Sequence, residues 1–471
     1  MAALGLWVLY ALVLILVARR SHFAILANDA FPLLFQAESL SWSDPRSFYN
    51  GFFPIGYPAL LRVLLLFGRQ HVDATGVFVN ILLAAPLVWC LVKLFALQGW
   101  SRWWALLGTT IAIFLPEMLR GVLSLRPDFI VTVLATSAIL AYRHDRFWLT
   151  GLLLGASCLF RTHALALVIG FAVVGLIYHN WRDIGRLVLC ALPFLAMQGF
   201  LNLAAGESFF SSSQGFNVAK MIYGADWRQD QLVPPSAIEV MLSEPMGLIR
   251  AYTSHLMTEW YLLLPLVVAA CIQRTREFAF IALFYFLAVG LGGSPRGSLP
   301  IQPIVVLCAF GVLTPLIARS KFSNSMVLPL GGAAAIFILS TTLLYRSAAN
   351  AGARIERYQD VGDRLGMRNI DDAKRVLTDD YAMYFPQIEN ASPYMNGGWG
   401  PIGIPLYRER MPQFMYDDPR KLHDSLAAYG VEFIVLGQPT GDPRLLETVL
   451  KDTTLFFRQA AINRYAVYKV R

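Results

Sequence analysis

Residues 26–58 read LANDAFPLLFQAESLSWSDPRSFYNGFFPIGYP, and this stretch decides how the rest of the chain is interpreted. It follows the first apolar run, residues 1–18, and precedes all the others. Asp29 comes about ten residues after that run, which places it near a membrane–water interface. A carboxylate beside a bilayer is costly and therefore marks a candidate functional site. Asn28-Asp29 also suits the cap of a helix that begins at Ala30, so both interpretations stay open at this point.

The composition places the chain among helical membrane proteins. Hydrophobic residues make up 56% of the 471 residues, charged residues make up 15%, and the mean hydropathy is +0.52. A soluble domain has about 25% charged residues. The net charge is +8, and the basic excess lies in residues 1–345, which hold 22 basic and 15 acidic side chains. This distribution predicts contact with anionic lipid and no nucleic-acid partner.

Eleven apolar runs are long enough, or nearly long enough, to cross a bilayer as helices. A shorter run at 53–68 contains Pro54 and Pro58, which discourage a regular helix start, so we interpret it as a juxtamembrane or re-entrant piece. The predicted fold class is a polytopic α-helical membrane domain over residues 1–345, with external loops at 20–73 and 205–255. The predicted spans are 1–18, 74–97, 103–119, 128–142, 147–161, 163–179, 186–204, 256–272, 277–291, 300–318 and 326–345.

Basic residues in the short loops predict the orientation, because cytoplasmic loops carry more Lys and Arg. With a cytoplasmic N-terminus, the loops on the cytoplasmic side hold the richer set of basic residues, from Arg102 to Lys321. An odd number of spans then puts the C-terminus outside. We therefore expect a multi-pass protein of the inner (plasma) membrane, with its C-terminal part external or periplasmic.

Residues 346–471 predict a small external α/β domain. Strand-like runs occur at Arg375–Leu377, Phe433–Leu436 and Tyr465–Val470. Asp418-Pro419 indicates a helix start and Gly430 a helix stop. Strands that alternate with helices are typical of such a domain. All five cysteines of the chain lie in apolar runs instead, so we expect no disulfide and no thiolate metal site.

Charged side chains at the external ends of the predicted spans are the candidate chemical groups. Asp128 follows Arg126, Arg161 interrupts an apolar run, and Arg296 precedes another. Taken singly, each arginine can reach lipid headgroups, and Asp128 can pair with Arg126 or complement a helix N-terminus. Together with Asp29, three guanidinium groups on one face predict an anion site beside a base, since arginine binds two phosphate oxygens at once. The sequence contains no phosphate-binding loop, no dinucleotide fingerprint and no paired histidines with zinc spacing.

These features, in this order, resemble the GT-C glycosyltransferases, which use polyprenyl-phosphate sugars and include the protein O-mannosyltransferases and the lipid A aminoarabinose transferase. The resemblance covers most of the chain, from the first span and its external loop to the α/β tail. The motifs that carry it are Asn28-Asp29-Ala30, the FPIGYPALL run from Phe53 to Leu61, Arg126-Pro127-Asp128, Gly151 with Gly155 and Arg161, and Arg296 before Pro300 and Pro303.

The resemblance implies roles for the acidic residues of the first loop. In that family the acid after the first span is the catalytic base, and this implies the same role for Asp29. A second acidic residue is present in several members. Its candidates in this chain are Glu38, Asp44 and Asp128.

The resemblance also implies a donor site, because external arginines of the family hold the lipid phosphate. Arg296 is expected to be the main ligand, with Arg126 and Arg161 as weaker ones. No cofactor and no metal is expected, since the lipid-linked sugar is itself the donor substrate. The expected partners are membrane lipid, a polyprenyl-phosphate sugar, and a glycan, lipid or protein acceptor.

The implied reaction is the inverting transfer of a hexose or pentose from polyprenyl phosphate to an acceptor hydroxyl at the external face. The phosphate leaves as a stable anion, so one carboxylate base is enough, whereas a glycosidase needs two carboxyl groups. A lipid-linked sugar flippase or transporter is an alternative, since intramembrane charges and a re-entrant segment fit a carrier too. A non-catalytic assembly protein for envelope polysaccharide is another. The large tail and first loop, without a detectable inverted repeat, favour the enzyme.

Overall fold

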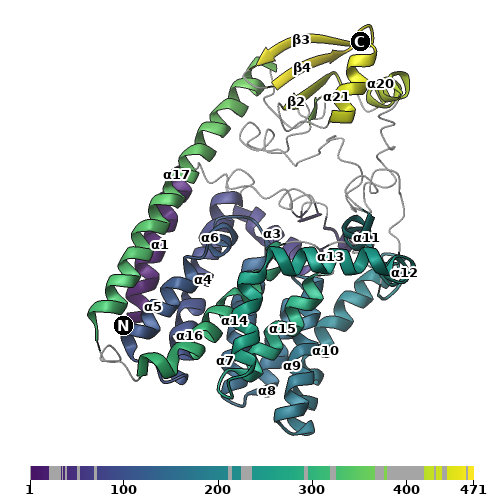
Figure 1. Cartoon of the computed structure of the whole chain (residues 1–471). Coiled ribbons are helices and arrows are strands. Elements are labelled where there is room, and N and C mark those ends of the chain that lie inside the picture. Colours follow the sequence, from purple (N-terminus) through teal and green to yellow (C-terminus); the bar gives the residue numbers. More distant parts are fainter. Residues whose placement is uncertain are drawn as a thin grey trace.

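The apolar runs form helices that stand side by side in a bundle, as the computed structural model shows (Figure 1). The structure describes residues 2–20, 33, 36–37, 40–49, 53–67, 72–210, 215–223, 236–290, 295–318, 325–365, 376–378, 418–428, 431–437, 443–462 and 465–471. The bundle helices are α1 (Ala2–Arg20), α4 (Val72–Leu97), α5 (Arg102–Ile113), α6 (Pro116–Val122), α7 (Pro127–Arg143), α8 (Phe147–Cys158), α9 (Leu165–Tyr178), α10 (Trp181–Ala204), α14 (Trp260–Ala270), α15 (Arg276–Gly290), α16 (Gln302–Ala318) and α17 (Val327–Leu365).

The chain is a multi-pass membrane protein. Five helical segments in the described residues are long and apolar enough to cross a bilayer, or six if the bent pair α5 and α6 counts as one span. Three shorter apolar helices, among them α8 and α14, lie in the same bundle, and a fourth, Gly56–Phe67, lies at its upper end. The predicted count of eleven spans exceeds the five or six that length and composition support, and it stays a prediction.

The predicted span 103–119 is not one straight helix. It is broken between α5 and α6, whose axes meet at 68°. The break falls at Leu115, whose backbone is extended (φ −58°, ψ 140°) and which precedes Pro116. A residue before proline avoids the helical region, and proline has no N–H to continue the helix but suits the first helical position.

Two glycines allow α8 and α10 to pack closely. A Cβ at Gly151 of α8 would lie 2.1 Å from the carbonyl oxygen of Leu187, and one at Gly155 would lie 2.8 Å from the Cα of Ala191. Both neighbours belong to the backbone of α10. Small residues four positions apart allow two membrane helices to approach in this way. The Gly151-x3-Gly155 motif is therefore a packing motif that holds α8 against α10.

The first loop folds back onto one end of the bundle. Its described part contains the 3-10 helix η1 (Pro45–Phe48), then α3 (Gly56–Leu64) and a final 3-10 turn, η2 (Leu65–Phe67). Figure 1 shows α3 beside α6 at the upper end of the bundle. Pro58 lies in the first turn of α3, where a missing N–H has no helical partner to lose, so the expectation that it discourages a helix start was wrong.

The predicted external loop 205–255 contains three helices in its described part, namely α11 (Gly215–Tyr223), α12 (Ala237–Ser243) and α13 (Pro245–Thr258). Figure 1 shows α13 lying across the upper end of the bundle rather than along it. The loop thus adds a helical layer to the end where α3 and α6 lie.

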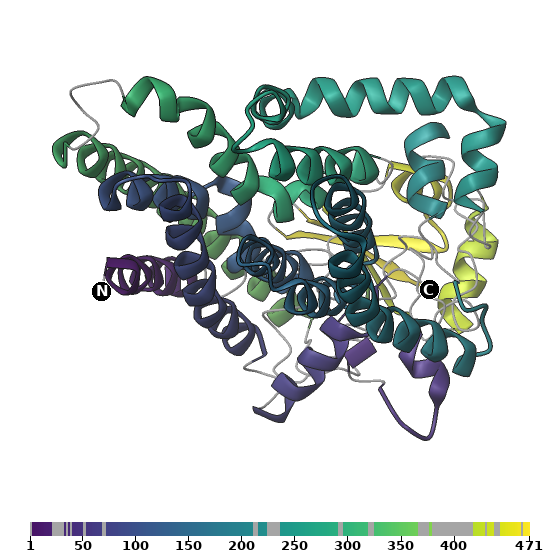
Figure 2. The same ribbon diagram turned by 90° about the horizontal axis from the view of Figure 1, so that it is seen from below.

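Helix α17 connects the bundle to the C-terminal sheet. It packs against α1 and α5 and then extends as one helix beyond the bundle (Figure 1). The view from below shows the strands behind the bundle (Figure 2). A single helix therefore crosses the predicted domain boundary at residue 345, and the division into 1–345 and 346–471 stays a prediction.

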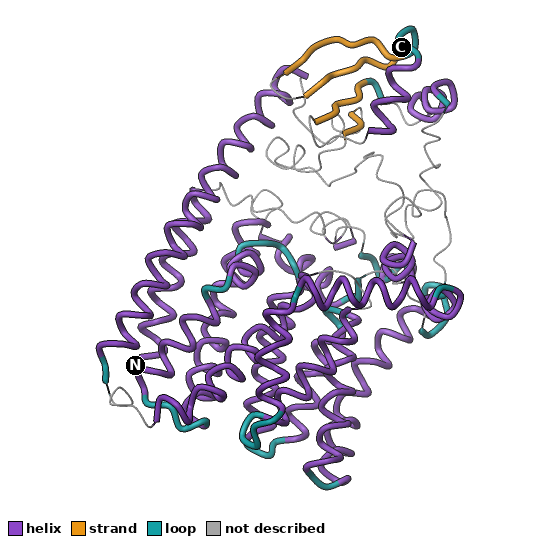
Figure 3. The backbone as a smooth tube through the Cα atoms, in the orientation of Figure 1, coloured by secondary structure: helices purple, strands orange, loops and turns teal. Residues whose placement is uncertain are grey.

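The C-terminal sheet has four strands in the order β1-β2-β4-β3 (Figure 3). β1 and β2 are parallel, with Val376 opposite Phe433, and the other two pairs are antiparallel. The elements are β1 (Val376–Thr378), α20 (Pro419–Ala428), β2 (Phe433–Gly437), α21 (Pro443–Lys451), β3 (Phe456–Ile462) and β4 (Tyr465–Val470). The three predicted strands and the helix start are found, while α21 and β3 were not predicted.

Candidate functional site

The structure describes one of the three acidic candidates in the first loop. Asp29 and Glu38 lie outside the described residues, so their roles stay predictions. Asp44 is exposed and caps η1, where its Oδ1 accepts a hydrogen bond from the backbone N–H of Arg46 at 3.2 Å. One of its carboxylate oxygens is therefore engaged in capping.

Asp128 and Arg161 form a buried ion pair in the bundle. Arg161 donates from Nε to Oδ1 of Asp128 at 3.0 Å and from Nη2 to Oδ2 at 2.7 Å. The Asp128 side chain is 3% exposed and that of Arg161 is 13% exposed. Two parallel hydrogen bonds between a guanidinium and a carboxylate fix both groups in orientation. Arg161 is thus the hydrogen-bonded partner of Asp128, which also lies in the first turn of α7.

Arg126 immediately precedes α7 and has an extended backbone (φ −138°, ψ 143°). Its side chain is half-buried and lies near enough to Asp128 for its charge to act on that carboxylate. Helix α7 begins at Pro127, whose fixed φ suits a first helical position. One turn of chain therefore places Arg126 and Asp128 together at the start of α7.

Arg296 lies in the seven-residue 3-10 helix η6 (Pro295–Ile301), which leads into α16. The side chains of Pro295 and Arg296 lie outside the described residues. The segment packs against α6, α7, α15 and α16. The segment that contains Arg296 thus lies beside α7, the helix that Arg126 precedes.

Two contacts that the sequence did not predict lie on η6. Tyr285 of α15 donates from Oη to the carbonyl oxygen of Gly297 at 2.9 Å, and Ser298 donates from Oγ to Oε2 of Glu259. All three side chains, those of Tyr285, Ser298 and Glu259, are buried. Glu259 had a signal in the sequence, because it is an acidic residue inside the predicted apolar span 256–272. Tyr285 had none, since an aromatic residue in an apolar run is ordinary.

The first loop docks beside the Asp128–Arg161 pair. The ring of Phe53 lies 5.3 Å from the guanidinium carbon of Arg161, which is within the range of a cation–π contact. The backbone N–H of Gly56 donates to the carbonyl oxygen of Leu159 at 2.7 Å. A Cβ at Gly56 would lie 2.5 Å from that oxygen, so the close approach requires glycine. The stretch that follows Asp29 in the chain therefore ends against the end of α8.

A polar relay holds the same loop against α10. The N–H of Ile55 donates to Oε1 of Gln198 at 3.0 Å, and Nε2 of Gln198 donates to Oδ1 of Asn202 at 3.0 Å. Asn202 in turn donates to the carbonyl oxygen of Phe209 at 3.1 Å. Neither amide was predicted, because a polar residue near the end of an apolar run is common.

The arrangement combines turns that are far apart in the sequence. Contacts join the start of α7, the turn after α8, the segment η6 and the run from Phe53 to Gly56. Because α3 lies at the upper end of the bundle, the Asp128–Arg161 pair beside it lies there too. A group of arginine-bearing turns at one end of a membrane bundle can bind an anion at the bilayer surface.

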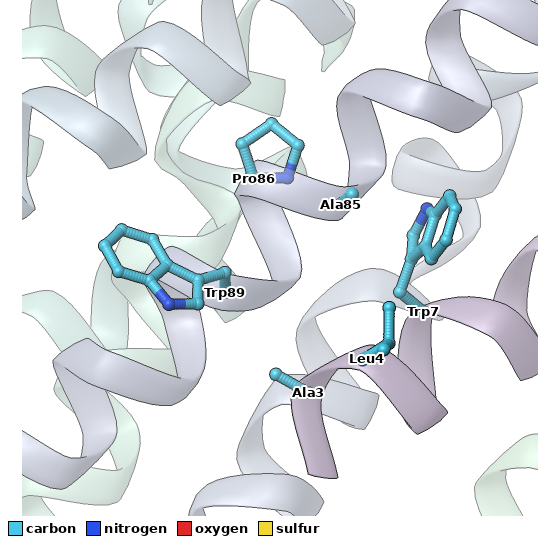
Figure 4. A pocket seen from close by; sticks show the side chains of 6 residues that line it. All are labelled: Ala3, Leu4, Trp7, Ala85, Pro86 and Trp89. Atoms are coloured by element: carbon cyan, nitrogen blue, oxygen red, sulfur yellow. The ribbon is translucent and has the colours of Figure 1, made fainter. Parts of the chain in front are cut away.

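A pocket of about 440 Å³ lies elsewhere, between α1 and α4 (Figure 4). Trp7 and Trp89 face it, and Pro86 interrupts the α4 hydrogen-bond pattern beside it. The N–H of Trp7 is already bonded to the carbonyl oxygen of Ile81 at 3.0 Å. The lining, Ala3, Leu4, Trp7, Ala85, Pro86 and Trp89, carries no charge and suits hydrocarbon rather than a reacting group.

The helical bundle, the first loop folded back on it and the sheet beyond it form a fold that is known from solved structures. The same fold is found in ArnT from Cupriavidus metallidurans, a lipid A aminoarabinose transferase. Its apo structure aligns with 100% of this chain and 98% of its own, with a TM-score of 0.54 and 12% sequence identity. Its structure bound to undecaprenyl phosphate aligns over 99% and 97%, with a TM-score of 0.53 and 12% identity.

The resemblance to GT-C enzymes predicted from the sequence is thus confirmed at the level of the fold. No protein-family model and no curated protein sequence matches the chain.

Proposed function

We propose that the chain is an inverting glycosyltransferase that moves a sugar from a polyprenyl-phosphate donor to an acceptor hydroxyl at the external face of the inner membrane. The acceptor is a glycan, a lipid or a protein. The full-length likeness to ArnT, one structure of which is bound to undecaprenyl phosphate, supports the donor class. The N-terminus would then be cytoplasmic and the C-terminal sheet external.

The observation that carries the proposal is the grouping of arginine-bearing turns at one end of the bundle. The turn of Arg126, the turn of Arg161 and the segment of Arg296 come from three separate parts of the chain. Arg161 already donates two hydrogen bonds to Asp128. Its charge is largely offset by that carboxylate, so Arg161 is a weaker candidate for the donor phosphate than Arg296.

Asp29 has the role of base in this proposal. It would take the proton of the acceptor hydroxyl while that oxygen attacks the anomeric carbon, and the bond from this carbon to the phosphate oxygen breaks. The arginines stabilise the negative charge that grows on the leaving phosphate. Because the attack and the departure occur on opposite faces of the sugar, a single displacement inverts the anomeric centre.

The first test is the identity of the lipid that co-purifies with the full-length protein. Mass spectrometry should detect a polyprenyl-phosphate hexose or pentose. Arg296→Ala should then weaken binding of undecaprenyl phosphate about tenfold or more, since a charge-assisted hydrogen bond is worth about 1.5–3 kcal/mol. Arg296→Lys should recover part of that affinity, because lysine keeps the charge and loses the two-point fork.

Arg62→Ala is the matched control, because this arginine belongs to the same end of the bundle through α3 but not to the proposed site. Equal affinities of wild type, Arg296→Ala and Arg62→Ala would remove Arg296 from the donor site. If the protein transports the lipid-linked sugar across the membrane without transferring it to an acceptor, the flippase interpretation would be correct and the enzyme interpretation wrong.

A further inference from the structure

The segment η6 depends on other elements for its conformation. It has seven residues, of which Pro295 and Pro300 have no N–H and Gly297 has no side chain. A 3-10 helix is also a poorer hydrogen-bonded structure than an α-helix and is rarely long. Its position must therefore come from contacts with its surroundings.

The two residues that follow Arg296, Gly297 and Ser298, are each held by a hydrogen bond to or from a buried side chain. The hydroxyl of Tyr285 donates to the carbonyl oxygen of Gly297 at 2.9 Å. The hydroxyl of Ser298 donates to Oε2 of Glu259, which lies between α13 and α14. Tyr285 and Ser298 are 0% exposed and Glu259 is 1% exposed. The two residues next to Arg296 are thus held by α15 on one side and by the α13–α14 junction on the other.

Burying Glu259 costs folding free energy, so its contact with Ser298 is hard to explain by stability alone. Its Oε1 is buried and has no hydrogen-bond partner among the described residues. A buried polar atom without a partner costs about 1–3 kcal/mol, and more if it is charged. An apolar side chain of similar size would avoid that cost, but it would leave the Ser298 hydroxyl without its acceptor.

We propose that Tyr285 and Glu259 are positioning residues, which hold η6 through Gly297 and Ser298 so that Arg296 meets the donor phosphate. This inference rests on the proposed function for the role of Arg296. Neither residue touches the substrate in this proposal. Their removal should lower the affinity for the phosphate through the backbone of η6, while the charge of Arg296 stays in place.

The test uses Tyr285→Phe with Tyr10→Phe as its matched control. Tyr10 is buried like Tyr285 and donates to the carbonyl oxygen of Ile113 at 3.0 Å, between α1 and α5. Both variants lose one tyrosine-to-carbonyl bond. Only Tyr285→Phe should weaken binding of undecaprenyl phosphate to the full-length protein in nanodiscs, by about fivefold to tenfold, while the loss of thermal stability should be similar in both.

The acceptor side is tested by two substitutions of Glu259. Glu259→Gln keeps an oxygen that can accept from Ser298, so it should retain affinity for undecaprenyl phosphate close to that of wild type. Glu259→Leu removes the acceptor and should lower the affinity as Tyr285→Phe does. Equal loss in both variants would mean that the charge of Glu259 matters and not its contact with Ser298, and this would overturn its positioning role.

Hydrogen exchange separates this inference from the proposed function. The backbone amides of residues 296–299 and of Ile301 should exchange faster in Tyr285→Phe and in Glu259→Leu than in wild type. Their exchange should be unchanged in Tyr10→Phe. Failure of the wild type to bind undecaprenyl phosphate would overturn the proposed function, and the exchange rates would still show whether these residues hold η6. Exchange and affinity that are the same in Tyr285→Phe and Tyr10→Phe would overturn the positioning proposal.

Discussion

Arg161 holds Asp128 by two parallel hydrogen bonds, although 33 positions separate the two residues. Asp128 lies in the first turn of α7, and Arg161 follows the end of α8, so the contact closes the α7–α8 hairpin at the end where the first loop docks. The pair therefore fixes the turn of Arg126 and the turn of Arg161 relative to each other.

Asp128→Asn should destabilise the protein strongly, because it leaves the mostly buried guanidinium of Arg161 without its charged partner. Breaking a buried pair typically costs about 3–5 kcal/mol. The matched control is Asp183→Asn on α10, whose pair with Arg186 at 3.2 Å is exposed and should contribute less than about 1 kcal/mol. Thermal unfolding of the purified variants in detergent measures both effects. Equal midpoints for the two variants would show that the buried pair contributes no more than the surface pair.

Gly56→Ala should disturb the docking of the first loop. The new Cβ would lie 2.5 Å from the carbonyl oxygen of Leu159, which is backbone and cannot rotate away, and overpacking of this kind costs about 1–3 kcal/mol. Gly5→Ala on α1 is the control, since nothing lies within 4 Å of its Cβ position. That change should be neutral or stabilising by up to about 1 kcal/mol. Protease digestion of the first loop, compared between the two variants, reports the loss of docking.

Asp29→Asn should abolish most of the transfer activity, because the amide keeps the shape of the side chain but cannot take a proton. Loss of a general base typically lowers the rate by about 10²–10⁴. Binding of undecaprenyl phosphate should be unchanged, since the base acts on the acceptor. Asp183→Asn on α10 is the control, because this carboxylate pairs with Arg186 away from the proposed site and should leave the rate near that of wild type. A wild-type rate in Asp29→Asn would move the search for the base to Glu38 and Asp44.

If the N-terminus is cytoplasmic and the C-terminal sheet is external, two exposed positions should differ in their labelling in intact cells. Asp424 of α20 has an 80% exposed side chain, and Arg186 of α10 has a 69% exposed side chain. In a background with Cys271→Ser, Asp424→Cys should react with a membrane-impermeant thiol reagent and Arg186→Cys should react only after cell lysis. The reverse pattern would place the C-terminal sheet in the cytoplasm and contradict an external site.

Much of the fold was predictable, because membrane helices and strands have local signals. Hydrocarbon thickness demands long apolar runs, and these runs predicted the five described helical segments that are long and apolar enough to cross a bilayer. The alternating pattern of Tyr465–Val470 identified β4, and Asp418 before Pro419 identified the start of α20. The break at Leu115 also has a local cause in Pro116, but the apolar run on both sides concealed it.

The sequence by itself determined the membrane class, the GT-C-like order of motifs and the positions of the charged residues, because burial in lipid is read from local composition. The tertiary structure alone decided which charges meet. Asp128 has Arg126 as a close neighbour in the chain and Arg161 as its direct partner in space. The packing of α8 against α7 and α10 brings that arginine into place. In the same way only the packing of α15 and α14 brings Tyr285 and Glu259 to η6, since contacts between helices far apart in sequence leave no periodic signal in either one.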